Sequence, residues 1–241
     1  MDKTLVLISS KGGSGKSTVA VGLATALSNE GKSVLLLDAD EGARCLDSML
    51  SVDANTVFDL REVLNGDVNY RDAMLKVETL SSVWVIPSPL SAEPLDLVRL
   101  GEFVKSVSSE FDYVIIDTKG QLPAERLSGL PCDFSFISVV TTDPIAVRNT
   151  GVLTSGLRKY GIIPRLIINR FKPKGFDNRT VNIDDIIDSS ATQLLGIIPE
   201  DRCITGSKGP LLSGIASAAV FRIASRIDGK HCRLPEIKDI I

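Results

Sequence analysis

The chain has 241 residues, of which 44% are hydrophobic and 24% charged, and its formal net charge is −3. A chain of this size can bury a substantial core in one large domain or two small ones, and no apolar run approaches the ~20 residues of a membrane-spanning helix. The slightly acidic balance argues against nucleic-acid binding by bulk electrostatics. Because Met1–Lys3 leads directly into the first apolar run, we expect no secretory signal and a cytoplasmic protein.

Short apolar runs alternate with helical patterns along most of the chain. Runs rich in Val, Ile and Leu predict strands at Thr4–Ile8, Ser33–Leu37, Ser82–Pro87, Tyr113–Ile116, Phe134–Val140, Arg165–Ile168 and Gln193–Ile197. Helices are predicted at Lys16–Asn29, Asp59–Leu64, Leu95–Ser108, Pro144–Tyr160, Asp184–Ser190 and Leu212–Ile227. Strands without polar alternation are buried on both faces, which indicates an α/β fold with a mostly parallel central sheet and helices on both faces. We expect a single domain over residues 1–241, with a short tail from about residue 230.

A glycine-rich stretch, SSKGGSGKST at residues 9–18, joins the first predicted strand to the first predicted helix. Strand, glycine loop and helix form the context of a phosphate-binding loop, in which backbone N–H groups and the helix N-terminus attract phosphate. Lys16 is placed to reach the β- and γ-phosphates, and the Ser17 hydroxyl to bind Mg²⁺. The residues predicted to contact nucleotide here are Lys11, Gly12, Gly13, Ser14, Gly15, Lys16, Ser17 and Thr18.

The loop departs from the G-x-x-x-x-G-K-[ST] pattern because Ser10 replaces the first glycine and a second lysine, Lys11, precedes the glycine pair. This KGGxGK[ST] form resembles the deviant Walker A motif of the MinD/ParA family of P-loop ATPases. The resemblance implies a P-loop NTPase fold, ATP or ADP with Mg²⁺ as cofactors, and slow hydrolysis. It also implies an ATP-dependent homodimer in which Lys11 reaches the partner's nucleotide, so that Lys11 acts in catalysis together with Lys16.

Two acidic residues, Asp38 and Asp40, follow the second predicted strand. Ligands of open α/β sheets bind at the carboxyl ends of strands, and carboxylates beside a phosphate loop can hold Mg²⁺ or orient an attacking water. The segment resembles the switch I region of the family, and Asp40 matches its catalytic aspartate. Taken alone, the D-x-D pair is equally typical of a turn or helix cap.

The fourth predicted strand, in FDYVIIDTKG, resembles a Walker B segment and ends in Asp117, a candidate for the second coordination shell of Mg²⁺. The family usually continues D-[ST]-P-A-G, a switch II loop that senses the γ-phosphate. Here Thr118 is followed by Lys119 and Gly120, so the proline is absent and a charge is added. This departure leaves the switch II geometry and the hydrolysis rate open, but it does not affect the prediction of ATP binding.

Two later loops indicate where the base of the nucleotide binds. Asn169 can present its amide to the N6/N7 edge of adenine, and the acid of a guanine-reading N-K-x-D motif is replaced by Lys172, which favours ATP over GTP. The Asn169–Arg170 pair resembles one found in the family. The segment LLGIIPEDRCI matches the family's loop after the last core strand, and the match places Pro199, Glu200 and Asp201 on the adenine and ribose side.

Two segments bear on the target of the protein. Basic residues from Arg165 to Arg179 are interleaved with Phe171 and Phe176, and such a loop could touch DNA or anionic lipid, although a solvated loop is favoured. In the tail, Leu234, Ile237, Ile240 and Ile241 share a helical face. Because Glu236 and Asp239 offset the basic residues, we expect the tail to dock on the protein rather than on the inner face of a membrane.

The sequence therefore favours a MinD-like switch ATPase that regulates or positions an unidentified protein partner, in cell division or partitioning. A ParA-like DNA-partitioning ATPase is one alternative. A metallochaperone or redox ATPase of the same fold is another, and it is disfavoured because the four cysteines (Cys45, Cys132, Cys203 and Cys232) are scattered without a C-x-x-C pair.

Overall fold

The computed structural model describes residues 3–172, 181–201 and 214–234. In this part of the chain one sheet has the strand order β3-β4-β2-β5-β1-β6-β7-β8. The strands are β1 (Thr4–Ile8), β2 (Val34–Ala39), β3 (Leu75–Lys76), β4 (Val83–Ile86), β5 (Tyr113–Thr118), β6 (Ser135–Val140), β7 (Arg165–Phe171) and β8 (Leu194–Pro199). Neighbouring strands pair in parallel, except that β3 pairs with β4 antiparallel.

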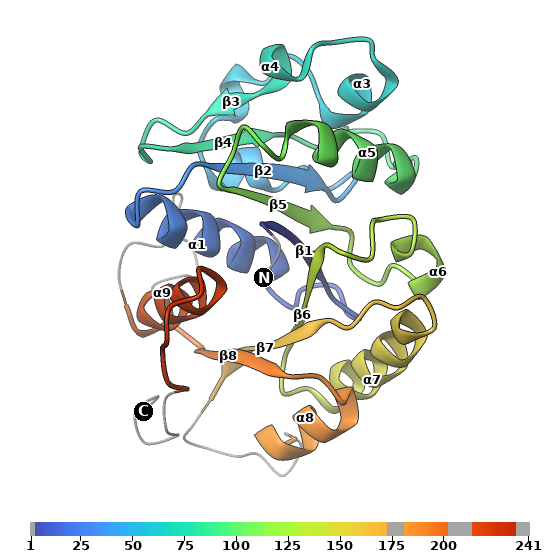
Figure 1. Cartoon of the computed structure of the whole chain (residues 1–241), viewed down its shortest axis with the longest axis vertical. Coiled ribbons are helices and arrows are strands. Elements are labelled where there is room, and N and C mark those ends of the chain that lie inside the picture. Colours follow the sequence, from blue (N-terminus) through green and yellow to red (C-terminus); the bar gives the residue numbers. More distant parts are fainter. Residues whose placement is uncertain (1–2, 173–180, 202–213, 235–241) are drawn as a thin grey trace.

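Helices cover both faces of this sheet (Figure 1). They are α1 (Lys16–Asn29), α2 (Leu46–Met49), the 3-10 turn η1 (Asp53–Asn55), α3 (Leu60–Asn65), α4 (Tyr70–Ala73), α5 (Leu97–Val107), α6 (Ala124–Leu127), α7 (Pro144–Arg158), α8 (Ile183–Ser190) and α9 (Ile215–Ile227). Leu5 and Leu7 of β1 share one core with α1 and α9, whereas Val6 and Ile8 share the other core with α3, α5, α6 and α7. The strands are therefore apolar on both faces, as the absence of polar alternation predicts.

The central position of β1 determines where the loops meet. β1 lies between β5 and β6, and β2 lies on the other side of β5. The register pairs Asp117 with Leu7 of β1 and with Asp38 of β2, at the carboxyl ends of all three strands. The glycine loop after β1 therefore begins directly beside two strands that end in acidic residues. In Figure 1 the carboxyl ends of these strands lie at one edge of the sheet, and α1 ends at the opposite edge.

The predicted mostly parallel α/β sheet is confirmed, and the structure differs from the expectation in two respects. β2, β5 and β7 continue through polar residues such as Asp38, Asp117 and Asn169, because buried strand ends keep their ladder hydrogen bonds whatever the side chain. The strand β3 and the helices α2, α4 and α6 were not predicted, since segments of two to four residues carry no period. The division into one domain with a tail from about residue 230 stays a prediction.

Candidate active site

The glycine loop is attached to α7 and β7. The Ser10 hydroxyl lies 3.0 Å from the carbonyl oxygen of Ala146 and 2.8 Å from the Thr150 hydroxyl, both in α7. On the other side, Asn169 Nδ2 donates to the carbonyl oxygen of Ser14 at 2.8 Å. The serine that replaces the first glycine of the motif therefore has a structural role, because its hydroxyl attaches the loop to α7.

Gly15 has to be glycine for two independent reasons. Its φ of +85° lies in the left-handed region that other residues rarely adopt. A Cβ built on Gly15 would also lie 2.3 Å from Asn169 Nδ2. The amide of Asn169 thus supports the loop at the residue where α1 begins, and its use in reading adenine stays a prediction.

Lys16 and Asp117 form a buried ion pair at the centre of the site. The distance from Lys16 Nζ to Asp117 Oδ1 is 2.7 Å, and the two side chains are 5% and 0% exposed. Asp117 Oδ2 and Ser14 Oγ are buried and find no hydrogen-bond partner among the described residues. Buried polar atoms normally have partners, so these two atoms fit a site that takes phosphate oxygens and a hydrated cation.

Asp38 holds the loop that follows β2. One carboxylate oxygen accepts from the backbone N–H of Asp40 at 3.1 Å, and the other accepts from those of Cys45 and Leu46 at 3.0 Å each. Burial and the neighbouring Asp117 raise the pKa of Asp38 to about 7, although the backbone hydrogen bonds oppose the shift. Asp38 is therefore a structural anchor of this loop, and its role toward Mg²⁺ stays a prediction.

Asp40 is half-buried at the start of the same loop. Its backbone is fixed by the Ser88 hydroxyl, which donates to the Asp40 carbonyl oxygen at 3.2 Å, and the next carbonyl, of Glu41, accepts from Lys119 Nζ at 3.3 Å. Burial raises the pKa of Asp40, and the nearby ammonium of Lys16 opposes that shift. Lys119, the residue that replaces the family's proline, thus ties the loop after β5 to the loop after β2.

Lys11 forms an ion pair that sequence reasoning did not anticipate. Its Nζ lies 3.2 Å from Asp143 Oδ1. Asp143 is the N-cap of α7 and accepts from the backbone N–H of Ala146 at 2.9 Å. The Thr-Asp-Pro sequence at residues 142–144 identifies a helix cap, but nothing in the sequence shows that this cap faces the glycine loop.

The predicted base-side residues come together at the ends of β7 and β8. Arg170 and Glu200 line a cleft of about 670 Å³ with residues 141–145, and Lys172 Nζ lies 2.7 Å from Glu200 Oε2. Pro199 ends β8 and pairs in register with Phe171. Asp201 Oδ2 accepts from the N–H of Ala216 at the start of α9.

Two further residues predicted to contact nucleotide, Ser17 and Thr18, lie in the first turn of α1 and are half-buried.

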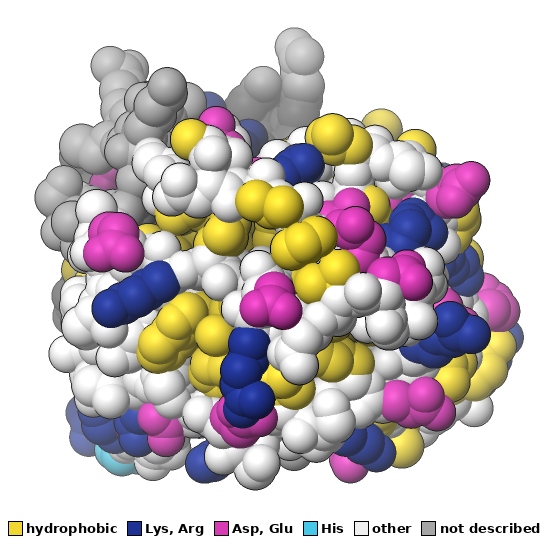
Figure 2. All heavy atoms as spheres, turned by 90° about the horizontal axis from the view of Figure 1, so that it is seen from above, with side chains coloured by type: hydrophobic (Ala, Val, Ile, Leu, Met, Phe, Trp, Pro, Cys, Tyr) yellow, Lys and Arg dark blue, Asp and Glu magenta, His cyan; other side chains and the backbone are white. Residues whose placement is uncertain are grey.

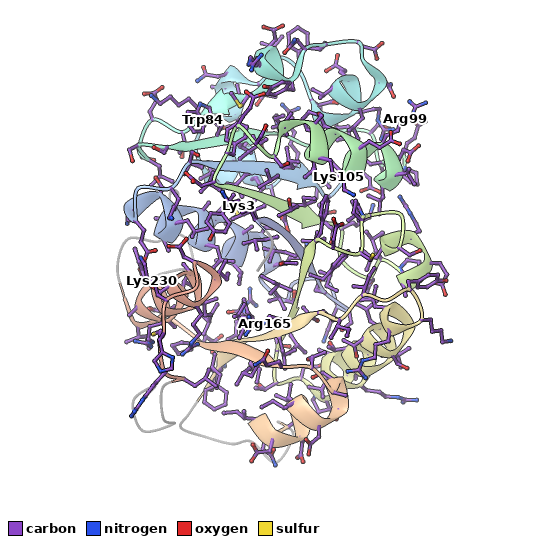
Figure 3. The ribbon with its side chains drawn as sticks, in the orientation of Figure 1. Lys3, Trp84, Arg99, Lys105, Arg165 and Lys230 are labelled. Carbon is purple, nitrogen blue, oxygen red and sulfur yellow. The ribbon has the colours of Figure 1, made fainter. Side chains whose placement is uncertain are left out.

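The predicted aromatic and basic loop does not form one surface in the described part of the chain. Phe171 is 1% exposed and packs in the core beside α7 and α8. It is therefore not part of a solvated loop, as favoured from the sequence, and it is not available for the alternative contact with DNA or lipid. Arg165, labelled in Figure 3, begins β7, whereas Lys172 follows the end of that strand, roughly 20 Å away at 3.3 Å per residue. Lys174, Phe176 and Arg179 lie outside the described residues. Figure 2 shows basic and acidic side chains interspersed on the face above β3 and α4.

The tail and the cysteines carry little further information. Leu234 is 47% exposed, and Ile237, Ile240 and Ile241 lie outside the described residues. Within residues 3–172, 181–201 and 214–234, none of the helices has the length and apolar character needed to cross a membrane. Cys45, Cys132 and Cys232 are free thiols, and Cys203 is not described.

A parallel sheet with a glycine loop after its central strand, a buried lysine at the start of α1 and acidic residues on two adjacent strand ends defines a P-loop nucleotide-binding protein. Residues 2–149 match the family model of an AAA domain. The MinD septum site-determining protein of Synechocystis is 30% identical over 95% of this chain and 91% of its own length.

Solved structures agree with the sequence match. The MinC:MinD cell division complex of Aquifex aeolicus has a TM-score of 0.86 at 27% identity, covering 98% of this chain and 99% of that one. MinD of Pyrococcus horikoshii, complexed with Mg-ADP, has a TM-score of 0.81 at 26% identity, covering 95% and 96%. The chain belongs to the MinD/ParA family of P-loop ATPases. It is a MinD-like ATPase.

Proposed function

We propose that this chain is a Mg²⁺-dependent switch ATPase that forms a homodimer with ATP and thereby acts on a protein partner, as in cell division. The observation that carries the proposal is the buried Lys16–Asp117 pair beside two orphaned polar atoms. A nucleotide phosphate is a suitable new partner for the ammonium, and a cation is a suitable new partner for the carboxylate. Nucleotide and metal would therefore bind together, each taking one member of the pair.

The roles of the site residues follow from this arrangement. The loop from Lys11 to Thr18 binds the phosphates, and Lys16 neutralises their charge. Ser17, Asp38 and Asp117 would hold Mg²⁺, whose positive charge would help to neutralise the phosphates. Among the described residues, no three His, Cys, Asp or Glu side chains are grouped to hold a metal, which fits a Mg²⁺ bound jointly by one or two carboxylates and the substrate phosphates. The adenine side is formed by Asn169, Arg170, Pro199, Glu200 and Asp201.

Asp40 and Lys11 have different functions in this proposal. Asp40 orients the attacking water, so its loss leaves ATP bound and uncleaved. Lys11 acts across the dimer on the partner's nucleotide, so its loss leaves binding intact and prevents both dimerisation and turnover. Its ion pair with Asp143 joins two exposed side chains, 43% and 39% accessible, and can be exchanged at little cost.

Light scattering with ATP and Mg²⁺ tests the switch. We expect Asp40→Ala to form a stable dimer, Lys11→Ala to remain monomeric while binding ATP, and the exposed Asp53→Ala control to behave as wild type. If wild type and Asp40→Ala both stay monomeric at saturating ATP, the switch proposal fails. The trapped Asp40→Ala dimer is also the form in which to capture the partner, by analogy with the relative that assembles with MinC.

The target surface is decided by a second measurement. We propose a protein target, because Phe171 is buried and Arg165 lies far from Lys172. Little ATP-dependent sedimentation with anionic liposomes is then expected, and little retention on DNA. Strong sedimentation that is lost on deleting the residues after Gly229 would instead identify a membrane-cycling protein, and ATP-dependent DNA retention would support the ParA-like alternative.

A further inference from the structure

The switch II segment of this chain differs from the family pattern at one more position than Lys119. The pattern D-[ST]-P-A-G has its glycine at the fifth position, where this chain has Gln121, and Gly120 comes one residue earlier. The segment therefore reads Asp-Thr-Lys-Gly-Gln from Asp117.

Gln121 nevertheless has the backbone conformation of a glycine. Its φ is +65°, in the left-handed region, which is unfavourable for a residue with a side chain. The conformation is held by the backbone N–H of Gln121, which donates to the carbonyl oxygen of Ser9 at 2.8 Å. The fold thus keeps a strained residue at this position, and what Gln121 adds relative to glycine is an exposed side-chain amide.

The position of Gln121 is next to the phosphate-binding loop. The backbone of the preceding Gly120 lies against Gly12, since a Cβ built on Gly120 would be 3.5 Å from Gly12 Cα and 3.6 Å from Gly12 N. Gln121 and Ser10 line the same cleft, between the loop after β5 and α7. Lys119 is turned the other way, toward the carbonyl oxygen of Glu41. Lys119 therefore contacts the loop after β2, whereas Gly120 and Gln121 contact the loop after β1.

A glutamine amide can accept a hydrogen bond from water through its oxygen and donate one to a phosphate oxygen through its nitrogen. P-loop NTPases of other classes use a switch II glutamine in this way, to orient the attacking water. We propose that Gln121 is a further catalytic residue of this ATPase, whose amide orients the attacking water from the P-loop side while Asp40 acts from the loop after β2. The inference rests on the proposed function of the same site.

The reaction needs no co-reactant beyond water. The water oxygen bonds to the γ-phosphorus, and the bond from that phosphorus to the bridging oxygen breaks, its electron pair leaving on ADP. One water proton passes to the transferred phosphate. Gln121 exchanges no proton, so its contribution is orientation alone.

Two substitutions test the proposal because they differ in backbone strain. Gln121→Gly removes the amide and relaxes the left-handed backbone, whereas Gln121→Ala removes the amide and keeps the strain. Both should lower kcat about 10²-fold, as misorientation of a reacting group does, with the Kd of ADP unchanged within about threefold. Both should also fail to form the ADP–aluminium fluoride complex that wild type forms. If Gln121→Ala does not fold, Gln121→Gly carries the test.

Either of two results would overturn the proposal: a wild-type kcat in Gln121→Gly, or wild-type retention of aluminium fluoride by both variants. A failure of the nucleotide site itself is detected separately, because Lys16→Ala would then bind ADP as tightly as wild type does. Combining Asp40→Ala with Gln121→Gly provides a further criterion. If both residues act on one water, the fold-decrease in kcat of the double variant should be smaller than the product of the fold-decreases of the two single variants.

Discussion

Lys11 and Asp143 connect the phosphate-binding loop to the N-cap of α7 through a 3.2 Å ion pair. The lysine for which we propose a role between subunits is thus held within its own subunit in this structure. Since both side chains are more than a third exposed, the pair is worth no more than ~1 kcal/mol. A phosphate group can therefore replace Asp143 as the partner of Lys11 at little cost in free energy.

Replacing Asp143 by asparagine should favour the dimer. Asparagine keeps the cap on α7 but releases Lys11, so the midpoint concentration for ATP-dependent dimerisation should fall by up to about fivefold, the equivalent of ~1 kcal/mol. Sedimentation velocity at several protein concentrations measures the midpoint. The control is Asp133→Asn, which removes the carboxylate of another exposed ion pair, with Lys105. A higher midpoint in Asp143→Asn would show that Asp143 assists Lys11.

Removing the ammonium of Lys16 should destabilise the protein even without nucleotide. Lys16→Met leaves Asp117, which is 0% exposed, without its buried cation. Breaking a buried ion pair by removing one member costs about 3–5 kcal/mol, whereas Lys11→Met, which breaks an exposed pair, should cost about 1 kcal/mol or less. Urea unfolding gives both values. Equal losses in the two lysine variants would mean that the Lys16 pair adds nothing to folding.

Asn169→Ala should weaken ADP and GDP together. Its amide nitrogen is bound to Ser14 and lies against Gly15, so its loss disturbs the loop that binds the phosphates of either nucleotide. We expect about tenfold weaker binding of both, which corresponds to one buried hydrogen bond. The control is Asp53→Ala, which changes an exposed residue outside the proposed nucleotide site. If only ADP is affected, the amide reads the base and does not support the loop.

Stability should fall in acid through Asp112. Hydrogen bonds from the backbone N–H and hydroxyl of Ser33 hold the pKa of Asp112 below its ordinary value of 3.8. Because the folded pKa is the lower one, this contribution to the free energy of unfolding is complete above about pH 4 and is lost as the pH falls through the folded pKa. Urea unfolding at pH 3 and pH 6 should give a smaller difference for Asp112→Asn than for wild type. An unchanged difference would contradict the assignment.

The sequence was sufficient to predict the α/β sheet because its strands are buried on both faces and lack polar alternation. It also placed the glycine loop, Asp38 and Asp117 correctly at strand ends that lie side by side. Contacts between segments distant in sequence could not be predicted. The Lys11–Asp143 pair and the Asn169–Ser14 hydrogen bond each join residues more than 130 positions apart, and neither leaves a local pattern. Phe171 was misread because a strand that continues past Asn169 and Arg170 buries the residue after them.

The ion pair between Lys230 and Glu30, at 2.8 Å, holds the third residue after α9 beside the C-terminal end of α1. α1 has 14 residues and spans about 21 Å at 1.5 Å per residue, with the nucleotide site at its other end. A label carried at position 230 would thus lie a helix length away from the phosphates. This is a favourable position for a reporter of assembly in living cells, because the label would not obstruct nucleotide exchange.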